Sequence, residues 1–397
     1  MKSKVLFTQE MDDLEIAVED LVRQTEGFEF KKNSIALVYG EDFEYEELYE
    51  RLREKWDFDI VGCTAMSMIT GMTGYTLEGI SVLLLSADDC TFATGITGTL
   101  TKSNYAEEIE KTYKNIEAKL DGEVKMVLAY GIMVKSVDDV SGDGYVDILD
   151  KLSNGAPVFG GLASDNFTFS SNRVFWNDVC VADAMNMVLI SGNIKPKFVS
   201  KNSIVNRALF SYVITESKAN HIFKLGNDTL VDVMDKEEIS NEKSDVVADY
   251  LLSPFLLSIP TKDGDVIETA RNISTLNHED GSGVFLGGMP EGSTLGIGII
   301  SREDVTNSVK KACEAINEEL KDDGYEYSTL LCTTCAARFL ALASDVEAEG
   351  QACINNLPKN MQLMGIYAFG EFCPVKGNNT GKMYNTFHNF TFTILAF

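Results

Sequence analysis

The sequence predicts an α/β protein with α+β character, in which two packed halves are built from mixed β-sheets covered by helices. Two observations indicate this fold class. Short apolar runs, several ending in glycine, alternate with helical stretches along the 397 residues, which is the order expected for sheets covered by helices. A strand–helix–strand–hairpin unit also recurs three times, so the chain carries weak internal repeats.

The first copy of this unit occupies residues 35–85. We expect a buried strand at 35–40, then a helix at 45–56 whose apolar residues recur at helical spacing. A short strand at 60–65 and a buried strand at 79–85 follow, with glycine-punctuated turns between them.

The same order returns twice downstream. In the second copy, the expected elements are strands at 125–131, 157–163 and 183–191 and a helix at 145–152. In the third copy, they are strands at 328–333, 363–370 and 390–397 and a helix at 336–353. Between these two copies we expect further strands at 283–287 and 294–300 and an amphipathic helix at 304–320.

A boundary between the halves is expected in the polar, charged stretch 232–245, which lacks hydrophobic periodicity. No proline-rich linker marks it, since the chain contains only seven prolines. We therefore predict two domains, one at 1–234 with its core from about residue 35 and one at 235–397.

The charge balance excludes one class of partner. Lys and Arg together number 34 and Asp and Glu number 61, which gives a formal net charge of −27. Such a field repels polyanions, because nucleic-acid affinity needs clustered cations that displace counterions. It also disfavours anionic membrane surfaces, and no window approaches 18 uninterrupted apolar residues. Since no signal-peptide pattern is present, we expect a cytoplasmic protein that binds neither nucleic acid nor membrane.

The sequence predicts no metal site. Its eight cysteines are too dilute for a disulfide framework. Cys332 and Cys335 form a single CxxC without a second pair at zinc-ligand spacing. The acidic run at 138–147 lacks the register and the closing glutamate of a calcium-binding EF-hand.

The strongest candidate site is a group of side chains near the C-terminus. Cys335 and Arg338 are expected where a strand meets the next helix, Glu371 after the glycine-bearing strand, and His388 and Asn389 at the opening of the last strand. Ligands collect where the ends of neighbouring strands converge. Arg338 can hold a carboxylate through a bidentate fork and Glu371 can accept from an ammonium group, which suits an amino acid. The alternative is a structural ion pair between Arg338 and Glu371, with His388 a buried imidazole.

The same residues permit an enzymatic alternative. A Cys335 thiolate at a helix start, with His388 and a carboxylate nearby, is the arrangement of cysteine nucleophiles. Sequence spacing does not show that the two residues meet, and no oxyanion-hole signature flanks them. We therefore predict no catalytic residue and keep the cysteine-dependent enzyme as the alternative.

Glycine-rich segments supply a second set of candidates. Gly160 and Gly161, followed by Asp165, can contact a ligand through the backbone. The structural alternative is a tight crossing of strands that only glycine allows. The glycine pairs at 71–74 and 95–98 are not phosphate loops, since neither has the P-loop spacing and following lysine.

Several motifs, taken in chain order, resemble the FIST family with its paired N-terminal and C-terminal domains. The N-terminal half carries Val61–Thr64 (VGCT) and Val158–Asp165 (VFGGLASD). The C-terminal half carries elements similar to the family's SCxxR-like, GFYxxGE and FHNxT motifs, namely Cys335–Arg338, Gly365–Glu371 and Phe387–Thr391. The resemblance covers nearly the whole chain from about residue 35.

This resemblance adds Cys63 and Thr64 to the candidate ligand-binding residues. It implies a sensory module of signal transduction that binds a small ligand, with amino acids as the proposed class. It also implies an alternative, since some similar proteins are haem-binding nitric-oxide sensors that act with a separate histidine kinase. The imidazoles available as axial haem ligands are His221, His278 and His388. Because no kinase, cyclase or chemotaxis output segment is evident, a partner protein such as a histidine kinase is expected to read the signal.

Overall fold

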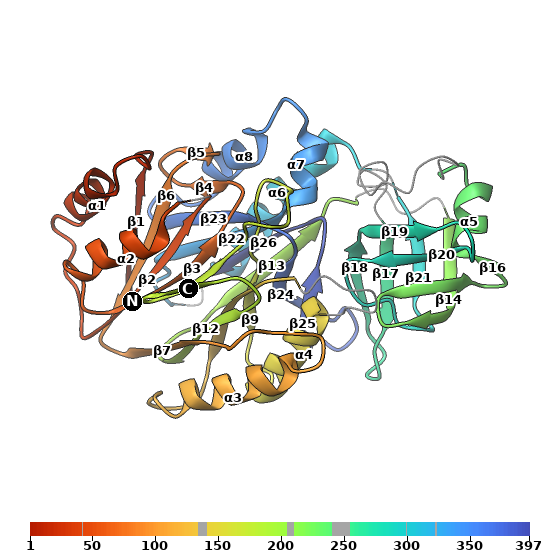
Figure 1. Cartoon of the computed structure of the whole chain (residues 1–397), viewed down its shortest axis with the longest axis horizontal. Helices are drawn as coiled ribbons and strands as arrows, with labels where there is room; N and C mark the ends of the chain where they lie inside the picture. Colours follow the sequence, from red (N-terminus) through yellow and green to blue (C-terminus); the bar gives the residue numbers. More distant parts are fainter. Residues whose placement is uncertain (42, 134–140, 205–209, 240–254, 299, 322–323) are drawn as a thin grey trace.

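A computed structural model describes residues 1–41, 43–133, 141–204, 210–239, 255–298, 300–321 and 324–397. Three six-stranded sheets form one body, which holds both chain ends, and an eight-stranded antiparallel sheet forms a second body beside it (Figure 1). We call the first the core body and the second, built from residues 210–236 and 255–297, the β-rich body. Mixed sheets covered by helices confirm the predicted fold class.

The first sheet contains the first copy of the repeated unit. Its strand order is β1–β6–β2–β3–β10–β11, and β2 and β3 are parallel. Helices α1 and α2 cover it with apolar faces that pack on β2 and β6. The bounds are β1 (Lys2–Thr8), α1 (Leu14–Arg23), β2 (Asn33–Gly40), α2 (Tyr45–Arg53), β3 (Asp59–Thr64), β6 (Ile80–Ala87), β10 (Val174–Trp176) and β11 (Val179–Val181).

The second sheet contains the second copy. Its order is β25–β24–β9–β8–β12–β7, and β8 and β9 are parallel. Helices α3 and α4 cover it. The bounds are β7 (Cys90–Ile96), α3 (Tyr105–Glu117), β8 (Met126–Gly131), α4 (Ser141–Leu152), β9 (Val158–Leu162), β12 (Met185–Gly192), β24 (Glu371–Lys376) and β25 (Met383–His388).

The third sheet contains the third copy. Its order is β13–β26–β22–β23–β4–β5, with β22 and β23 parallel and α6 and α8 packed on it. The predicted helix at 336–353 is divided into α7 and α8, because the chain turns at Ala343, whose φ is 53°. The bounds are β4 (Met68–Thr70), β5 (Gly74–Thr76), β13 (Lys197–Asn202), α6 (Arg302–Glu319), β22 (Thr329–Cys335), α7 (Ala336–Leu342), α8 (Ala348–Asn356), β23 (Gln362–Ala368) and β26 (Thr391–Ala396).

Each copy sends a hairpin into the sheet of another copy. β4 pairs with β23, β10 pairs with β3, and β24 pairs with β9. The three copies are thereby interlocked around a shared apolar interior, where the buried hydroxyls of Tyr39 and Tyr130 are hydrogen-bonded. Strands from both sides of the predicted domain boundary at 234/235 pair in this way, and that boundary stays a prediction.

The β-rich body holds the predicted strands at 283–287 and 294–300. Its order is β18–β17–β21–β14–β15–β20–β19, with β16 on β15. Part of the predicted boundary stretch forms α5, which begins with a capping box between Thr229 and Asp232; residues 240–245 of that stretch lie outside the described residues. The bounds are β14 (Phe210–Lys218), β15 (His221–Leu225), β16 (Asp228–Thr229), α5 (Leu230–Lys236), β17 (Phe255–Pro260), β18 (Val266–Arg271), β19 (Ile273–Asn277), β20 (Ser282–Phe285) and β21 (Thr294–Ile297).

Candidate functional site

The C-terminal ends of β3, β9 and β23, each the second strand of a parallel pair, meet inside the core body. Ser164, two residues after β9, accepts a hydrogen bond from the Met66 amide (3.0 Å) and donates one to the Tyr367 carbonyl (2.5 Å). Its own amide donates to the Thr64 carbonyl (3.2 Å). One buried serine therefore ties together the ends of β3, β9 and β23, where sequence analysis placed several candidates.

Two of these candidates, Thr64 and Asp165, organise the loop at 165–173. The Thr64 hydroxyl accepts from the Arg173 amide (2.9 Å). Asp165 accepts from the backbone amides of residues 169–171 at 2.8, 2.7 and 2.9 Å. Burial alone raises the pKa of Asp165, but the hydrogen bonds from the loop outweigh burial and lower that pKa. Its carboxylate is therefore engaged in folding the loop.

Cys63, Gly160 and Gly161 lie within the strands. Cys63 is buried, and burial raises the pKa of its thiol. Gly160 has a φ of +136°, and a Cβ there would lie 2.0 Å from the Ala129 carbonyl oxygen. Gly161 is paired with Glu371 on β24, and a Cβ on it would lie 2.5 Å from a carbonyl oxygen. These distances favour the strand-crossing interpretation of the two glycines.

Arg338 is completely buried at the start of α7. Its Nε and Nη2 donate to Glu349 Oε1 (3.0 and 2.5 Å), and Nη2 also donates to the Val305 carbonyl (3.2 Å). Its Nη1 donates to the Ser203 hydroxyl (2.6 Å) and the Phe390 carbonyl (3.3 Å). A guanidinium has five N–H donors, so all five are used within the protein. Arg338 therefore takes part in a structural ion pair, but its acidic partner is Glu349 and not Glu371, which the sequence had suggested.

Glu371, the partner expected for Arg338, lies beside Cys335. Glu371 Oε2 accepts a long bond from the Thr391 amide (3.4 Å), while Glu371 Oε1 and Asn389 Oδ1 are buried without a hydrogen-bond partner among the described residues. Burial raises the pKa of Glu371 well above its usual range, and the nearby Arg338 only partly offsets this rise. Burial, and then Glu371, raise the pKa of the Cys335 thiol as well. Burial is thus the largest cause of both pKa shifts.

Both ring nitrogens of His388 have partners other than Cys335. Its Nε2 donates to the Cys373 carbonyl (3.0 Å), and its Nδ1 lies 3.3 Å from the Thr269 hydroxyl. Burial lowers the pKa of His388 to about 4, so the imidazole is neutral at pH 7. In the described part of the chain, the cysteine–histidine arrangement of the enzymatic alternative is therefore not formed.

The three imidazoles do not fit an axial haem ligand. Both ring nitrogens of His388 have partners within the protein. His221 lies in the β-rich body, with Nε2 2.8 Å from the Ser282 hydroxyl and its ring 4.2 Å from that of Phe223. His278 follows β19 on an exposed turn of the same body. Of the three, only His388 is fully buried, and neither of its ring nitrogens is available to an iron atom.

A second buried arginine, which sequence analysis did not single out, joins the two bodies. Arg271 on β18 donates to the Phe387 carbonyl (3.1 Å) and to Asp143 Oδ1 on α4 (2.8 Å). Asp143 also accepts from the Gly288 amide (2.6 Å). The acidic run at 138–147 thus supplies an inter-body ion pair, while its residues 138–140 lie outside the described residues. The sequence signal that could have identified Arg271 is its position at the end of a half-buried strand.

A groove of about 880 Å³ runs between the two bodies. Its walls are β13, one face of α6 and the β24–β25 hairpin of the core body, and the β17–β18 hairpin of the β-rich body; we call it the seam groove. His388 and Thr391 belong to its wall, so Glu371, which accepts from the Thr391 amide, lies behind that wall. The lining residues are Pro157, Pro196–Asn202, Ile204, Leu256, Val266, Glu268, Ser308, Lys311, Ala315, Glu319, Pro374–Lys376, Asn378, Gly381, Met383, His388 and Thr391.

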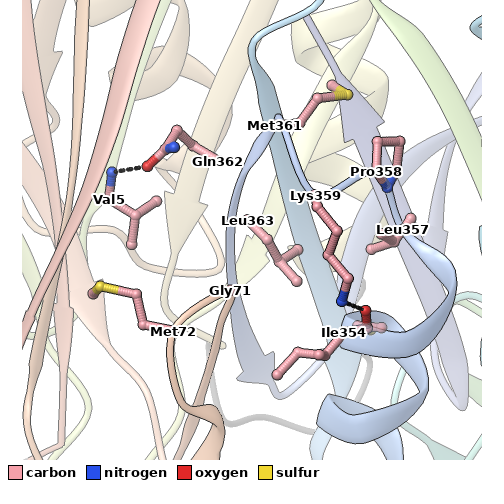
Figure 2. A pocket seen from close by; sticks show the side chains of 11 residues that line it. Val5, Gly71, Met72, Ile354, Leu357, Pro358, Lys359, Met361, Gln362 and Leu363 are labelled. Carbon is pink, nitrogen blue, oxygen red and sulfur yellow. Dashed lines mark hydrogen bonds between the residues drawn. The ribbon is translucent and has the colours of Figure 1, made fainter.

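A smaller pocket of about 210 Å³ lies among β1, the turn after β4 and the end of α8 (Figure 2). Its two long polar side chains are engaged within the protein: Gln362 accepts from the Val5 amide (2.9 Å), and Lys359 donates to the Ile354 carbonyl. The seam groove is the larger of the two and is lined by both bodies, so we take it as the candidate ligand site.

Two further findings concern metal ions and membranes. Among the described residues, no group of three or more His, Cys, Asp or Glu side chains is placed to hold a metal ion. Within the same ranges, no helix combines the length and apolar character needed to cross a membrane.

These features define a class of protein: three interlocked α/β repeats joined to a β-rich body, with a groove at the seam. The chain belongs to the FIST family, since the FIST N domain matches residues 34–228 and the FIST C domain matches residues 231–374. The family expected from the sequence is therefore confirmed. FIST domains are sensor domains of signal transduction.

Two solved structures are similar in outline. A chorismatase is 9% identical with a TM-score of 0.38, over 99% of this chain and 97% of that chain. A cyanuric acid hydrolase from A. caulinodans is 7% identical with a TM-score of 0.35, over 99% of this chain and 98% of that chain. At these TM-scores, the similarity says nothing about what this chain does. Among curated proteins, no sequence matches.

Proposed function

We propose that this FIST protein senses a small metabolite, an amino acid or a related compound, that binds in the seam groove. A separate partner protein, such as a histidine kinase, then reads the result. The observation that carries the proposal is the position of the groove, whose lining comes from both bodies. A ligand that contacts both bodies favours the packing to which it binds more tightly, and that shift in population is the signal.

The predicted site residues support this groove from behind. Arg338 holds the Phe390 carbonyl, and Glu371 accepts from the Thr391 amide. Both contacts fix the segment 388–391, which forms part of the groove wall. We infer that Arg338 and Glu371 are positioning residues, and that the ligand contacts the groove side chains instead.

The test is a thermal-shift and calorimetric screen of the twenty amino acids and their 2-oxo acids. Ala315 lies on the groove face of α6, so Ala315→Trp fills the groove. Ala106 is an exposed alanine on α3, outside the groove, and Ala106→Trp is the matched control. We expect at least one compound to bind the wild type and Ala106→Trp but not Ala315→Trp. A flat response from folded wild-type protein to every compound would rule out the amino-acid version.

A further inference from the structure

The seam groove is rich in positive charge, although the chain carries a net charge of −27. Four lysines and two glutamates line it. Lys197 is paired with Glu319, with 3.6 Å between Nζ and Oε2. Lys201, Lys311 and Lys376 are exposed and have no ion-pair partner among the described residues. Unpaired lysines gathered in one groove of so acidic a protein indicate an anionic ligand.

Two of these lysines stand opposite each other. Lys197 is the first residue of β13 and Glu319 is the last residue of α6. Because these two residues form an ion pair and the two elements pack together, α6 lies antiparallel to β13. From that pair to Lys201, β13 advances by about 13 Å. Lys311 lies about 12 Å from the same pair along the axis of α6. Lys201 and Lys311 therefore lie at the same level of the groove, on facing elements.

Apolar side chains lie beside these charges. Val266 on β18 and Met383 on β25 are 46% and 42% exposed, and both line the groove. Phe198 on β13 lines it as well. Large apolar side chains that remain exposed next to cations suit a ligand with both an apolar part and a negative charge.

We propose that the ligand of the seam groove is a small organic anion, a carboxylate on an apolar body, whose carboxylate binds between Lys201 and Lys311. Two like charges at the same level repel each other, and a carboxylate between them makes two attractive contacts that offset this repulsion. Glu268 on the opposite wall is an acceptor for an ammonium group, so amino acids stay within this class. The inference rests on the proposed function, because it names the chemistry of a ligand for the same groove.

The experiment compares four probes by NMR of protein labelled with [¹³C-methyl]methionine. Hexanoate, hexan-1-ol and hexylammonium share one apolar body and differ in charge, and acetate has the carboxylate without that body. The Met383 methyl reports on the groove, while Met72, which is 57% exposed and lines the smaller pocket of Figure 2, reports on binding there. We expect hexanoate to shift Met383 with a Kd about tenfold below those of the other three probes.

Charge reversal locates the carboxylate. Lys201→Glu and Lys311→Glu should each raise the Kd for hexanoate about tenfold or more. Lys310→Glu is the matched control, because Lys310 is exposed on α6 next to Lys311 but does not line the groove. It should change the Kd by less than about threefold, since exposed charges beyond contact range are screened.

The outcomes separate the two claims. Equal binding of hexanol or hexylammonium at Met383, or hexanoate binding that survives both reversals, overturns the anion inference and leaves the groove a ligand site. Acetate binding as tightly as hexanoate overturns the apolar part. No shift of Met383 with any probe, together with no amino acid or 2-oxo acid binding to folded protein, overturns the proposed function.

Discussion

Replacing Glu349 by glutamine is expected to lower the free energy of unfolding by about 3 kcal/mol, because it leaves a buried guanidinium without its counter-charge. The side chains of Arg338 and Glu349 are both 0% exposed, and Glu349 Oε1 accepts from Arg338 Nε and Nη2. Glutamine keeps the shape and an oxygen acceptor, so Glu349→Gln isolates the charge. Removing one member of such a buried pair typically costs about 3–5 kcal/mol, and the retained acceptor places this variant at the lower end.

The assay is urea unfolding at pH 7, followed by the fluorescence of the two tryptophans, Trp56 and Trp176. The control is Glu47→Gln, which breaks an exposed pair with Arg51 at 2.8 Å and should cost less than about 1 kcal/mol. Raising the salt concentration should shrink the control effect and leave that of Glu349→Gln unchanged, since buried pairs are poorly screened.

A loss for Glu349→Gln no larger than that for Glu47→Gln would refute the buried pair. It would also reopen Arg338 as a ligand-binding residue, because its donors would then be free to reach one. The double variant Arg338→Met with Glu349→Leu should recover most of the lost stability, since apolar replacement of a buried pair is often neutral. Failure of that rescue would indicate that the Ser203 and Phe390 contacts of Arg338 matter more than its charge.

Three further predictions concern single residues. Burial lowers the pKa of His388 to about 4, so the unfolded chain binds more protons than the native protein between that value and about 6.5. The neutral His388 therefore contributes its full stabilisation above that window and loses it as the pH falls through it. Between pH 7 and 4, the free energy of unfolding of His388→Gln should fall by about 3 kcal/mol less than that of the wild type. Equal falls in the two proteins would contradict this. Cys335 should react with a thiol reagent at pH 8 more slowly than the half-buried Cys180, and Cys335 as the fastest thiol would revive the enzymatic alternative. Gly160→Ala should cost more than about 3 kcal/mol, since its Cβ would lie 2.0 Å from a carbonyl oxygen; at Gly155, with φ +80° and open space, alanine should cost about 1–2 kcal/mol, and similar losses at both sites would contradict the packing argument.

The repeated unit was predictable because its glycines mark close approaches of the backbone. Gly62, Gly160 and Gly365 sit on the second strand of each parallel pair, and a Cβ on them would lie 1.8, 2.0 and 2.8 Å from the nearest atom of the first strand. Each copy therefore shows a glycine inside an apolar run. The exchange of hairpins between sheets was not predictable, because β4–β23 and β9–β24 are long-range pairings without a local sequence signal.

The position of Arg338 where a strand meets the next helix was predictable from the sequence, but its acidic partner was not. In one continuous helix, Glu349 would lie about 16 Å along the axis from Arg338. The turn at Ala343 instead brings α8 back against α7 and closes the pair. The groove lysines could not be predicted from the sequence. Lys201 and Lys311 have the pattern of ordinary exposed lysines, and only the packing of β13 against α6 brings them to one groove.

Hydrogen–deuterium exchange, read by mass spectrometry with and without saturating hexanoate, decides whether one ligand contacts both bodies. The groove lies between β13 and α6 of the core body and the β17–β18 hairpin of the β-rich body. The proposal predicts slower exchange in all three elements and unchanged exchange in α1 and α2, which lie away from the groove (Figure 1). Slower exchange confined to one body, or none at saturation, would contradict a ligand that bridges the seam.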